Sequence, residues 1–104
     1  MKSITPKELK ARLDAGDPVE IIDVREDWEV ARGTLAEATH IPMNDVPDEL
    51  ERIPQDKDVV IICHSGSRSA TVIDWLQAQG YQNLYNLDGG ILRWKKEVDP
   101  SIHA

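Results

Sequence analysis

The stretch DVVIICHSGSRSATVIDWL, from Asp58 to Leu76, decides the fold of this chain. It begins with β-branched apolar residues, passes through a loop of small polar residues, and continues with apolar residues at helical spacing. The segment Asp58–Cys63 is apolar on both faces, which is typical of a parallel strand covered by helices on two sides. Cys63, the only cysteine of the protein, lies where this strand ends. The stretch therefore predicts a strand, a loop and a helix, with a thiol at the carboxyl end of the strand.

Short strand and helix patterns alternate through the rest of the chain. Apolar runs predict strands over Val19–Val24 and Gln82–Leu87, and a short or edge strand near Ile41, just before Pro42. Strands that alternate with helices indicate a mostly parallel sheet between two helical layers. In open parallel sheets, ligands bind beyond the carboxyl ends of the strands, which is where Cys63 lies.

Capping and stop residues predict the helices between these strands. Thr5, Pro6 and Glu8 form a capping box at the start of the first helix, which ends near Gly16. Further helical patterns lie at residues 26–33, 68–80 and 91–98, and Asn44 or Asp45 is expected to cap one over residues 45–53. Trp28, Trp75 and Trp94 are interpreted as packing residues rather than as a ligand site.

Length and composition narrow the classes of function. The chain has 104 residues and a net charge of -7, so one domain over residues 1–104 is expected. The acidic balance argues against nucleic acid, because that partner requires basic patches. No apolar run approaches the ~18 residues of a membrane span, and the start MKSITPKELK lacks an apolar signal region, so a cytoplasmic protein is expected. One cysteine and scattered histidines indicate no internal disulfide and no metal site.

The loop CHSGSR has the chemistry of an anion cradle. Its backbone N–H groups belong to no ladder, and the following helix directs its positive end toward Cys63. Small residues let the backbone curl tightly, and the arginine adds a planar, positively charged donor group. The alternative for Cys63, an inert buried thiol, is weakened by its small and polar neighbours. The expected catalytic residue is Cys63, and the expected binding residues are His64, Ser65, Gly66, Ser67 and Arg68.

Several neighbouring residues have two interpretations. Arg68 either binds an anionic donor or forms an outward ion pair with a carboxylate such as Asp74. Asp23 and Arg25 either support the pocket or fix a turn. His64 is interpreted as a residue at the rim of the pocket, because adjacent side chains diverge and do not form a cysteine–histidine pair.

Loop size distinguishes two cysteine chemistries. Cysteine phosphatases use C-x5-R, a ring that fits a tetrahedral phosphate, whereas only four residues separate Cys63 from Arg68 here. A tighter ring suits a single sulfur atom on the thiolate. The count therefore favours sulfur transfer over a phosphatase or arsenate reductase, which stays as the alternative enzyme.

At four segments the sequence resembles the rhodanese (sulfurtransferase) family. These are CHSGSRSA, IIDVRE (residues 21–26), NLDGGILRW (residues 86–94) and EVARGTLAEATHIP (residues 29–42). The last segment departs from the family pattern, since Thr34, Ala36 and Glu37 replace the usual histidine, proline and glycine. The resemblance implies an α/β fold of three layers, α/β/α, with a central, mostly parallel sheet of five strands.

The resemblance also implies a reaction of double displacement. Cys63 would take a sulfur atom from thiosulfate or a persulfide, and a thiol, cyanide or a protein acceptor would remove it. The resemblance implies that no metal or organic cofactor is required. The ending ILRWKKEVDPSI resembles rhodanese domains attached to adenylyltransferases, so a sulfur-relay module serving a sulfur-carrier protein is a further alternative. The natural donor, the acceptor and the oligomeric state are left open by the sequence.

Overall fold

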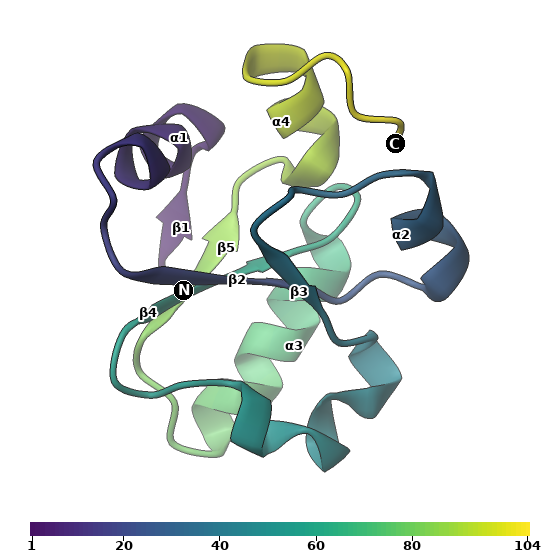
Figure 1. Ribbon diagram of the computed structural model, residues 1–104. Helices are drawn as coiled ribbons and strands as arrows, with labels where there is room; N and C mark the ends of the chain where they lie inside the picture. Colours follow the sequence, from purple (N-terminus) through teal and green to yellow (C-terminus); the bar gives the residue numbers. More distant parts are fainter.

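A sheet of five parallel strands forms the centre of the computed structural model, which describes residues 1–104 (Figure 1). The strands lie in the spatial order β1-β5-β4-β2-β3, so β4 is the middle strand. Every neighbouring pair runs parallel. Their bounds are β1 Ser3–Ile4, β2 Val19–Asp23, β3 Ala38–His40, β4 Asp58–Ile62 and β5 Leu84–Leu87. The central position of β4 places Cys63, the next residue, in the middle of the carboxyl edge of the sheet.

Helices cover both faces of this sheet and confirm the predicted α/β fold of three layers. In Figure 1, α1 and α4 lie on one side of the sheet and α3 on the other. None of the helices is long and apolar enough to cross a bilayer. The helices are α1 Pro6–Asp14, α2 Asp27–Arg32, α3 Ser67–Ala78 and α4 Gly90–Glu97, and two 3₁₀ helices are η1 Met43–Asp48 and η2 Leu50–Arg52.

The side chains of β4 divide between two hydrophobic clusters because successive residues of a strand point to opposite faces. Val59 and Ile61 belong to the cluster that contains Val72, Ile73 and Leu76 of α3. Val60 and Ile62 belong to the opposite cluster, with residues of α1 and α4. All four strand side chains are fully buried. Burial of each contributes about 1.5–3 kcal/mol, so β4 is fixed from both sides just before the cysteine.

The first helix forms as its sequence predicts. The hydroxyl of Thr5 accepts a hydrogen bond from the Glu8 amide at 3.1 Å, and the Glu8 carboxylate accepts one from the Thr5 amide at 2.8 Å. The strand β1 before it was not predicted, because two residues are too few to show a periodic pattern. It pairs with β5, Ser3 beside Asn86 and Ile4 beside Leu87.

The helix expected over residues 45–53 is wrong. The segment forms the two 3₁₀ helices η1 and η2, and η1 begins after Pro42 without any side-chain cap from Asn44 or Asp45. Pro47 lies inside η1. Proline has no N–H and its ring collides with the carbonyl four residues earlier, which prevents a continuous α-helix. The edge strand near Ile41 is present, but it ends at His40.

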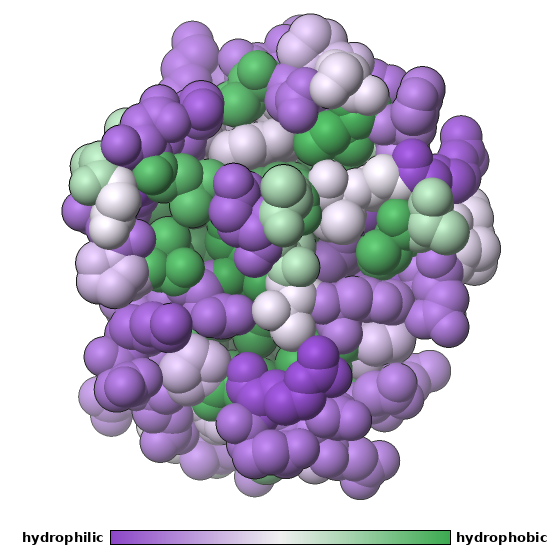
Figure 2. Space-filling view, viewed as in Figure 1, coloured by the Kyte–Doolittle hydropathy of each residue, from purple (hydrophilic) through white to green (hydrophobic).

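Hydrophobic surface remains exposed near α1 and α4. Figure 2, viewed with these helices above the sheet and α3 below it, shows hydrophobic patches between polar residues. A hollow of about 300 Å³ there includes Leu13, Leu35 and Trp94 in its lining. No residue of the loop from Cys63 to Arg68 lines it, so this hollow is separate from the predicted site.

Candidate active site

The sulfur of Cys63 accepts hydrogen bonds from the backbone of the loop that follows β4. The Gly66 amide nitrogen lies 3.1 Å from Sγ, and the Ser69 amide nitrogen lies 3.4 Å from it. Cys63 is completely buried and belongs to the hydrophobic cluster on the α3 side of the sheet. Two N–H groups and the N-terminal end of α3 therefore surround the sulfur with positive potential. This arrangement favours a negatively charged sulfur.

A buried chain of side-chain hydrogen bonds extends from the same sulfur. The Ser69 hydroxyl oxygen lies 3.3 Å from Sγ and donates to Asn86 Oδ1 at 2.6 Å. The Asn86 amide group donates in turn to the Gly66 carbonyl at 3.0 Å. Ser69 is fully buried. The single proton of this hydroxyl goes to Asn86 in this arrangement, so the hydroxyl can accept from a neutral thiol, and to donate to a thiolate it must give up its bond to Asn86.

Two glycines give the loop its path. Gly66 has a φ of 105°, a left-handed conformation that favours glycine. Gly90 has a φ of 64°, and a Cβ there would lie 2.5 Å from the His64 carbonyl oxygen and 2.7 Å from that of Cys63. The close approach lets the Ile91 and Leu92 amides at the start of α4 donate to those two carbonyls, at 2.9 and 3.1 Å. The tight turn before α4 thus also anchors the first two residues of the loop.

Asp23 and Arg25 form a buried ion pair at the end of β2. The Arg25 Nη2 atom lies 2.9 Å from Asp23 Oδ2, and both side chains have at most 1% of their surface exposed. Asp23 also accepts from the Arg25 amide and from the Thr34 hydroxyl, and Arg25 donates to the Gly33 carbonyl. These contacts fix the turn at residues 33–34, where the sequence departs from the family pattern. These contacts match the turn interpretation of the pair, and its support of the pocket stays a prediction.

Arg68 does not pair with Asp74, the partner expected for its alternative role. Its two terminal nitrogens bind both oxygens of Glu29 in α2, at 2.6 and 2.8 Å. Hydrogen bonds from Arg68 are the main reason that the pKa of Glu29 falls to about 2. In this arrangement the Arg68 guanidinium is already bound to a carboxylate.

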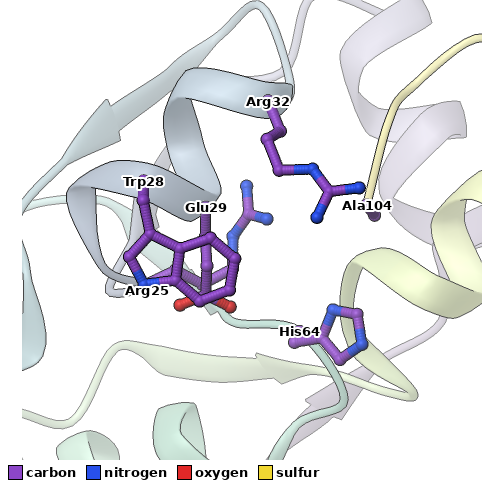
Figure 3. A pocket seen from close by; sticks show the side chains of 6 residues that line it. All are labelled: Arg25, Trp28, Glu29, Arg32, His64 and Ala104. Carbon is purple, nitrogen blue, oxygen red and sulfur yellow. The ribbon is translucent and has the colours of Figure 1, made fainter.

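Beside the loop lies a hollow of about 180 Å³, drawn in Figure 3. His64 lines it, as expected for a residue at the rim of a pocket, and Arg25 forms part of the same wall. Trp28 also lines the hollow and is 63% exposed, so the interpretation of Trp28 as a core or partly buried packing residue is wrong. Trp94 is buried and Trp75 is 38% exposed. The remaining lining residues are Glu29, Arg32 and Ala104.

Sequence reasoning missed two parts of this site. Ser69 and Asn86 were outside the expected binding residues, although each carries a signal. Ser69 is one residue beyond the arginine of the loop, and Asn86 is a polar residue in the otherwise apolar end of a strand. Of the expected residues, Gly66 contacts the sulfur directly, whereas the side chains of His64 and Arg68 are directed to the hollow and to Glu29. No cluster of three or more His, Cys, Asp or Glu side chains could hold a metal ion.

The chain is similar to proteins of known name along almost its whole length. The family model described as rhodanese-like domain matches residues 5–97. A putative sulfurtransferase of Bacillus subtilis, YtwF, is 41% identical over 96% of this chain and 96% of its own. A sulfurtransferase of Allochromatium vinosum is 36% identical over 98% of this chain and 95% of its own. The crystal structure of a rhodanese-like domain protein from Staphylococcus aureus superposes with a TM-score of 0.88 at 40% identity, and covers 99% of this chain and 97% of its own.

Proposed function

This chain belongs to the rhodanese-like domain family, and from that premise we propose that it is a sulfurtransferase whose transferred sulfur is carried on Cys63. The single observation that carries the proposal is the pair of main-chain N–H groups, from Gly66 and Ser69, directed at Sγ. Donors placed around an atom that bears negative charge stabilise that charge without reorganising. The names of the two sulfurtransferase relatives support the same reaction class.

In the first step the Cys63 thiolate attacks the outer sulfur of the donor. With thiosulfate, the bond from Sγ to that sulfur forms while the donor's S–S bond breaks, and sulfite leaves with the electron pair of the broken bond. With an organic persulfide, the leaving group is the corresponding thiolate. Cys63 then carries a persulfide with its negative charge on the outer sulfur, which the loop from His64 to Arg68 is proposed to hold.

In the second step an acceptor nucleophile attacks the outer sulfur of the Cys63 persulfide. Cyanide would leave as thiocyanate, and a thiol would leave as a persulfide. In both cases Sγ keeps the electron pair of the broken S–S bond, which regenerates the thiolate. Neither step consumes an external oxidant or reductant, because the donor supplies the sulfur at the oxidation level at which the acceptor receives it.

Access to the sulfur requires a local movement, because Cys63 has no exposed surface in the described arrangement. The short helix α2 is the element best suited to move, since none of its residues is buried. It is attached to the loop through Glu29 and Arg68. We therefore expect α2 and the loop to separate when the donor approaches Sγ.

Three relatives indicate donors and acceptors to examine first. GlpE of Pseudomonas entomophila, named a thiosulfate sulfurtransferase, is 30% identical over 90% of this chain and 84% of its own. This supports thiosulfate as a donor. MoeZ of Mycobacterium tuberculosis, named a probable adenylyltransferase/sulfurtransferase, is 31% identical, but this chain spans only 26% of it. YrkF of Bacillus subtilis, named a putative sulfur carrier protein, is 29% identical over 92% of this chain and 52% of its own. That name supports a protein acceptor, such as a sulfur carrier, as an alternative to a small thiol.

The proposal is tested by steady-state transfer from thiosulfate, or from glutathione persulfide, to cyanide or dithiothreitol. Because Cys63 is the only cysteine, Cys63→Ser removes every thiol from the protein. We expect transfer by the wild type and none by the variant. Transfer that persists in Cys63→Ser would overturn the proposal, and so would vanadate-sensitive hydrolysis of an aryl phosphate by a wild type that transfers no sulfur.

A further inference from the structure

Asn86 joins β5 to the segment after Cys63 through its side chain. Its strand lies beside β4, so the amide group can reach across to the loop. The amide nitrogen donates to the Gly66 carbonyl at 3.0 Å, and Oδ1 accepts from the Ser69 hydroxyl at 2.6 Å. A third contact, with the Met1 sulfur, is weak at 3.9 Å. One side chain from a neighbouring strand therefore binds two residues of the catalytic segment.

These two residues are the ones whose main chain faces the sulfur. The amide nitrogens of Gly66 and Ser69 lie 3.1 and 3.4 Å from Cys63 Sγ. Gly66 has a φ of 105° and no side chain, so its conformation depends on the bonds that its backbone makes. Its carbonyl is held by the Asn86 amide and by the Ala70 amide, the latter at 3.3 Å. Asn86 thus helps to fix the direction of both N–H groups.

The Gly66 carbonyl also decides how the Asn86 amide is turned. A carbonyl can only accept, so the NH₂ group of Asn86 must face Gly66, and Oδ1 then faces Ser69. The proton of the Ser69 hydroxyl is therefore directed at Asn86 in this arrangement. A hydrogen bond to a charged acceptor is stronger than one to a neutral amide oxygen. When the sulfur is a thiolate, the hydroxyl can rotate and donate to Sγ, 3.3 Å away.

We propose that Asn86 is a positioning residue for sulfur transfer, which holds Gly66 and Ser69 so that their N–H groups and the Ser69 hydroxyl stay directed at Sγ. Asn86 makes no hydrogen bond to the sulfur, so it acts through the other two residues. Negative charge returns to Sγ in each turnover, when the acceptor removes the outer sulfur, and fixed donors stabilise that charge. This inference rests on the proposed sulfurtransferase function and gives β5 a part in it.

The test makes two measurements on Asn86→Ala. One is the rate at which the intact protein gains sulfur as the thiosulfate concentration rises. The other is the pH at which half of the ultraviolet absorbance of the Cys63 thiolate has appeared, with Cys63→Ser as the blank. We expect the maximal loading rate at neutral pH to fall about tenfold, with little change in the half-saturating concentration. We expect the thiolate midpoint to move to higher pH, because misdirected donors favour the charged form less.

Asn83→Ala is the matched control. Asn83 also donates to two backbone carbonyls, those of Pro54 and Lys57, but it lies just before β5 begins, at the opposite edge of the sheet. Its loss should lower the free energy of unfolding in urea and leave the loading rate and the thiolate midpoint unchanged. The ionisable groups around the loop are the same in both variants, namely Arg68 with Glu29, Arg25 with Asp23, and His64.

A double variant shows whether Asn86 acts through Ser69. In a Ser69→Ala background, Asn86→Ala should slow loading by only about threefold, because part of its effect is already lost. Rate losses that multiply in full would overturn the inference, and so would a single variant with the wild-type rate and midpoint.

A second substitution covers the case in which Asn86→Ala does not fold. Asn86→Asp keeps an acceptor for Ser69 and loses the donor to Gly66, so its loading should also be slower and its midpoint higher. Wild-type values in Asn86→Asp would overturn the inference while the sulfurtransferase function stands. A wild type that gains no sulfur from any donor would instead overturn the function, and the thiolate midpoint would still test the positioning.

Discussion

Arg68 and Glu29 form an ion pair of two hydrogen bonds, 2.6 and 2.8 Å long, between the first turn of α3 and α2. The pair connects the loop around Cys63 to a helix that has no buried residue of its own. Hydrogen bonding from Arg68 holds the pKa of Glu29 at about 2, below its ordinary value of 4.5. Glu29 is therefore ionised at neutral pH, and α2 is fastened to the catalytic loop.

The contribution of this pair to stability should depend on pH. Because the pKa of Glu29 is lowered by folding, the stabilisation is complete above about pH 4.5 and disappears as the pH falls toward 2. We expect Glu29→Gln to lower the free energy of unfolding by about 1 kcal/mol at pH 7. Urea unfolding at pH 7 and pH 3 should show the difference from wild type shrinking at the lower pH.

Glu97→Gln provides the comparison for that experiment. Glu97 pairs with Arg93 one turn away on the exposed side of α4, so its loss should change stability less. A difference between wild type and Glu29→Gln that is as large at pH 3 as at pH 7 would contradict the assigned ion pair.

The Ser69 hydroxyl should contribute to the rate of sulfur transfer. Ser69→Ala removes a buried hydroxyl 3.3 Å from Sγ, which can turn from Asn86 to donate to the charged sulfur, and leaves Asn86 Oδ1 without its 2.6 Å partner. We expect the maximal rate of sulfur loading to fall about tenfold, with little change in the half-saturating concentration of thiosulfate. Stopped-flow loading followed by mass analysis measures both quantities.

Ser3→Ala is the control, because Ser3 is an exposed serine of β1, outside the loop, that makes no side-chain hydrogen bond to the sulfur. It should load at nearly the wild-type rate. Equal maximal rates for Ser69→Ala and Ser3→Ala would show that the Ser69 hydroxyl has no part in the reaction.

Gly90 should be sensitive to any added side chain. A Cβ would lie within 2.7 Å of the Cys63 and His64 carbonyl oxygens, and the φ of 64° is itself unfavourable for alanine. We expect Gly90→Ala to lower the free energy of unfolding by about 3 kcal/mol. Gly16→Ala has a similar φ of 72° with open space around it, and should cost only about 1 kcal/mol in chemical denaturation. Equal losses in the two variants would argue against the packing of α4 on the loop.

Local patterns predicted most of the fold. The capping box at Thr5 and Glu8 is formed by neighbours three residues apart, so the sequence alone defines it. The run Asp58–Cys63 has apolar residues on both faces, which predicted a strand buried on both sides. In the structure it forms the central strand. The α-helix predicted for the segment after Pro42 was wrong. The spacing of its polar and apolar residues suggested an α-helix, but Pro47 lacks the backbone N–H that a continuous α-helix needs at that position.

The site was only partly predictable because its contacts join residues distant in sequence. Cys63 and Gly66 follow one another in a single loop, so their relationship could be inferred. Asn86 reaches the loop only because β5 lies beside β4, and Glu29 reaches Arg68 only because the fold brings α2 to the start of α3. Such tertiary neighbours leave no fixed spacing in the chain.

The most direct measurement of the central claim is the intact mass of the protein before and after one addition of donor. The account predicts that wild type gains one sulfur atom from thiosulfate or glutathione persulfide. It also predicts that cyanide removes this atom with release of an equal amount of thiocyanate, and that Cys63→Ser gains none. A wild-type protein whose mass is unchanged by every donor, or a Cys63→Ser variant that gains the same sulfur, would contradict a persulfide on Cys63.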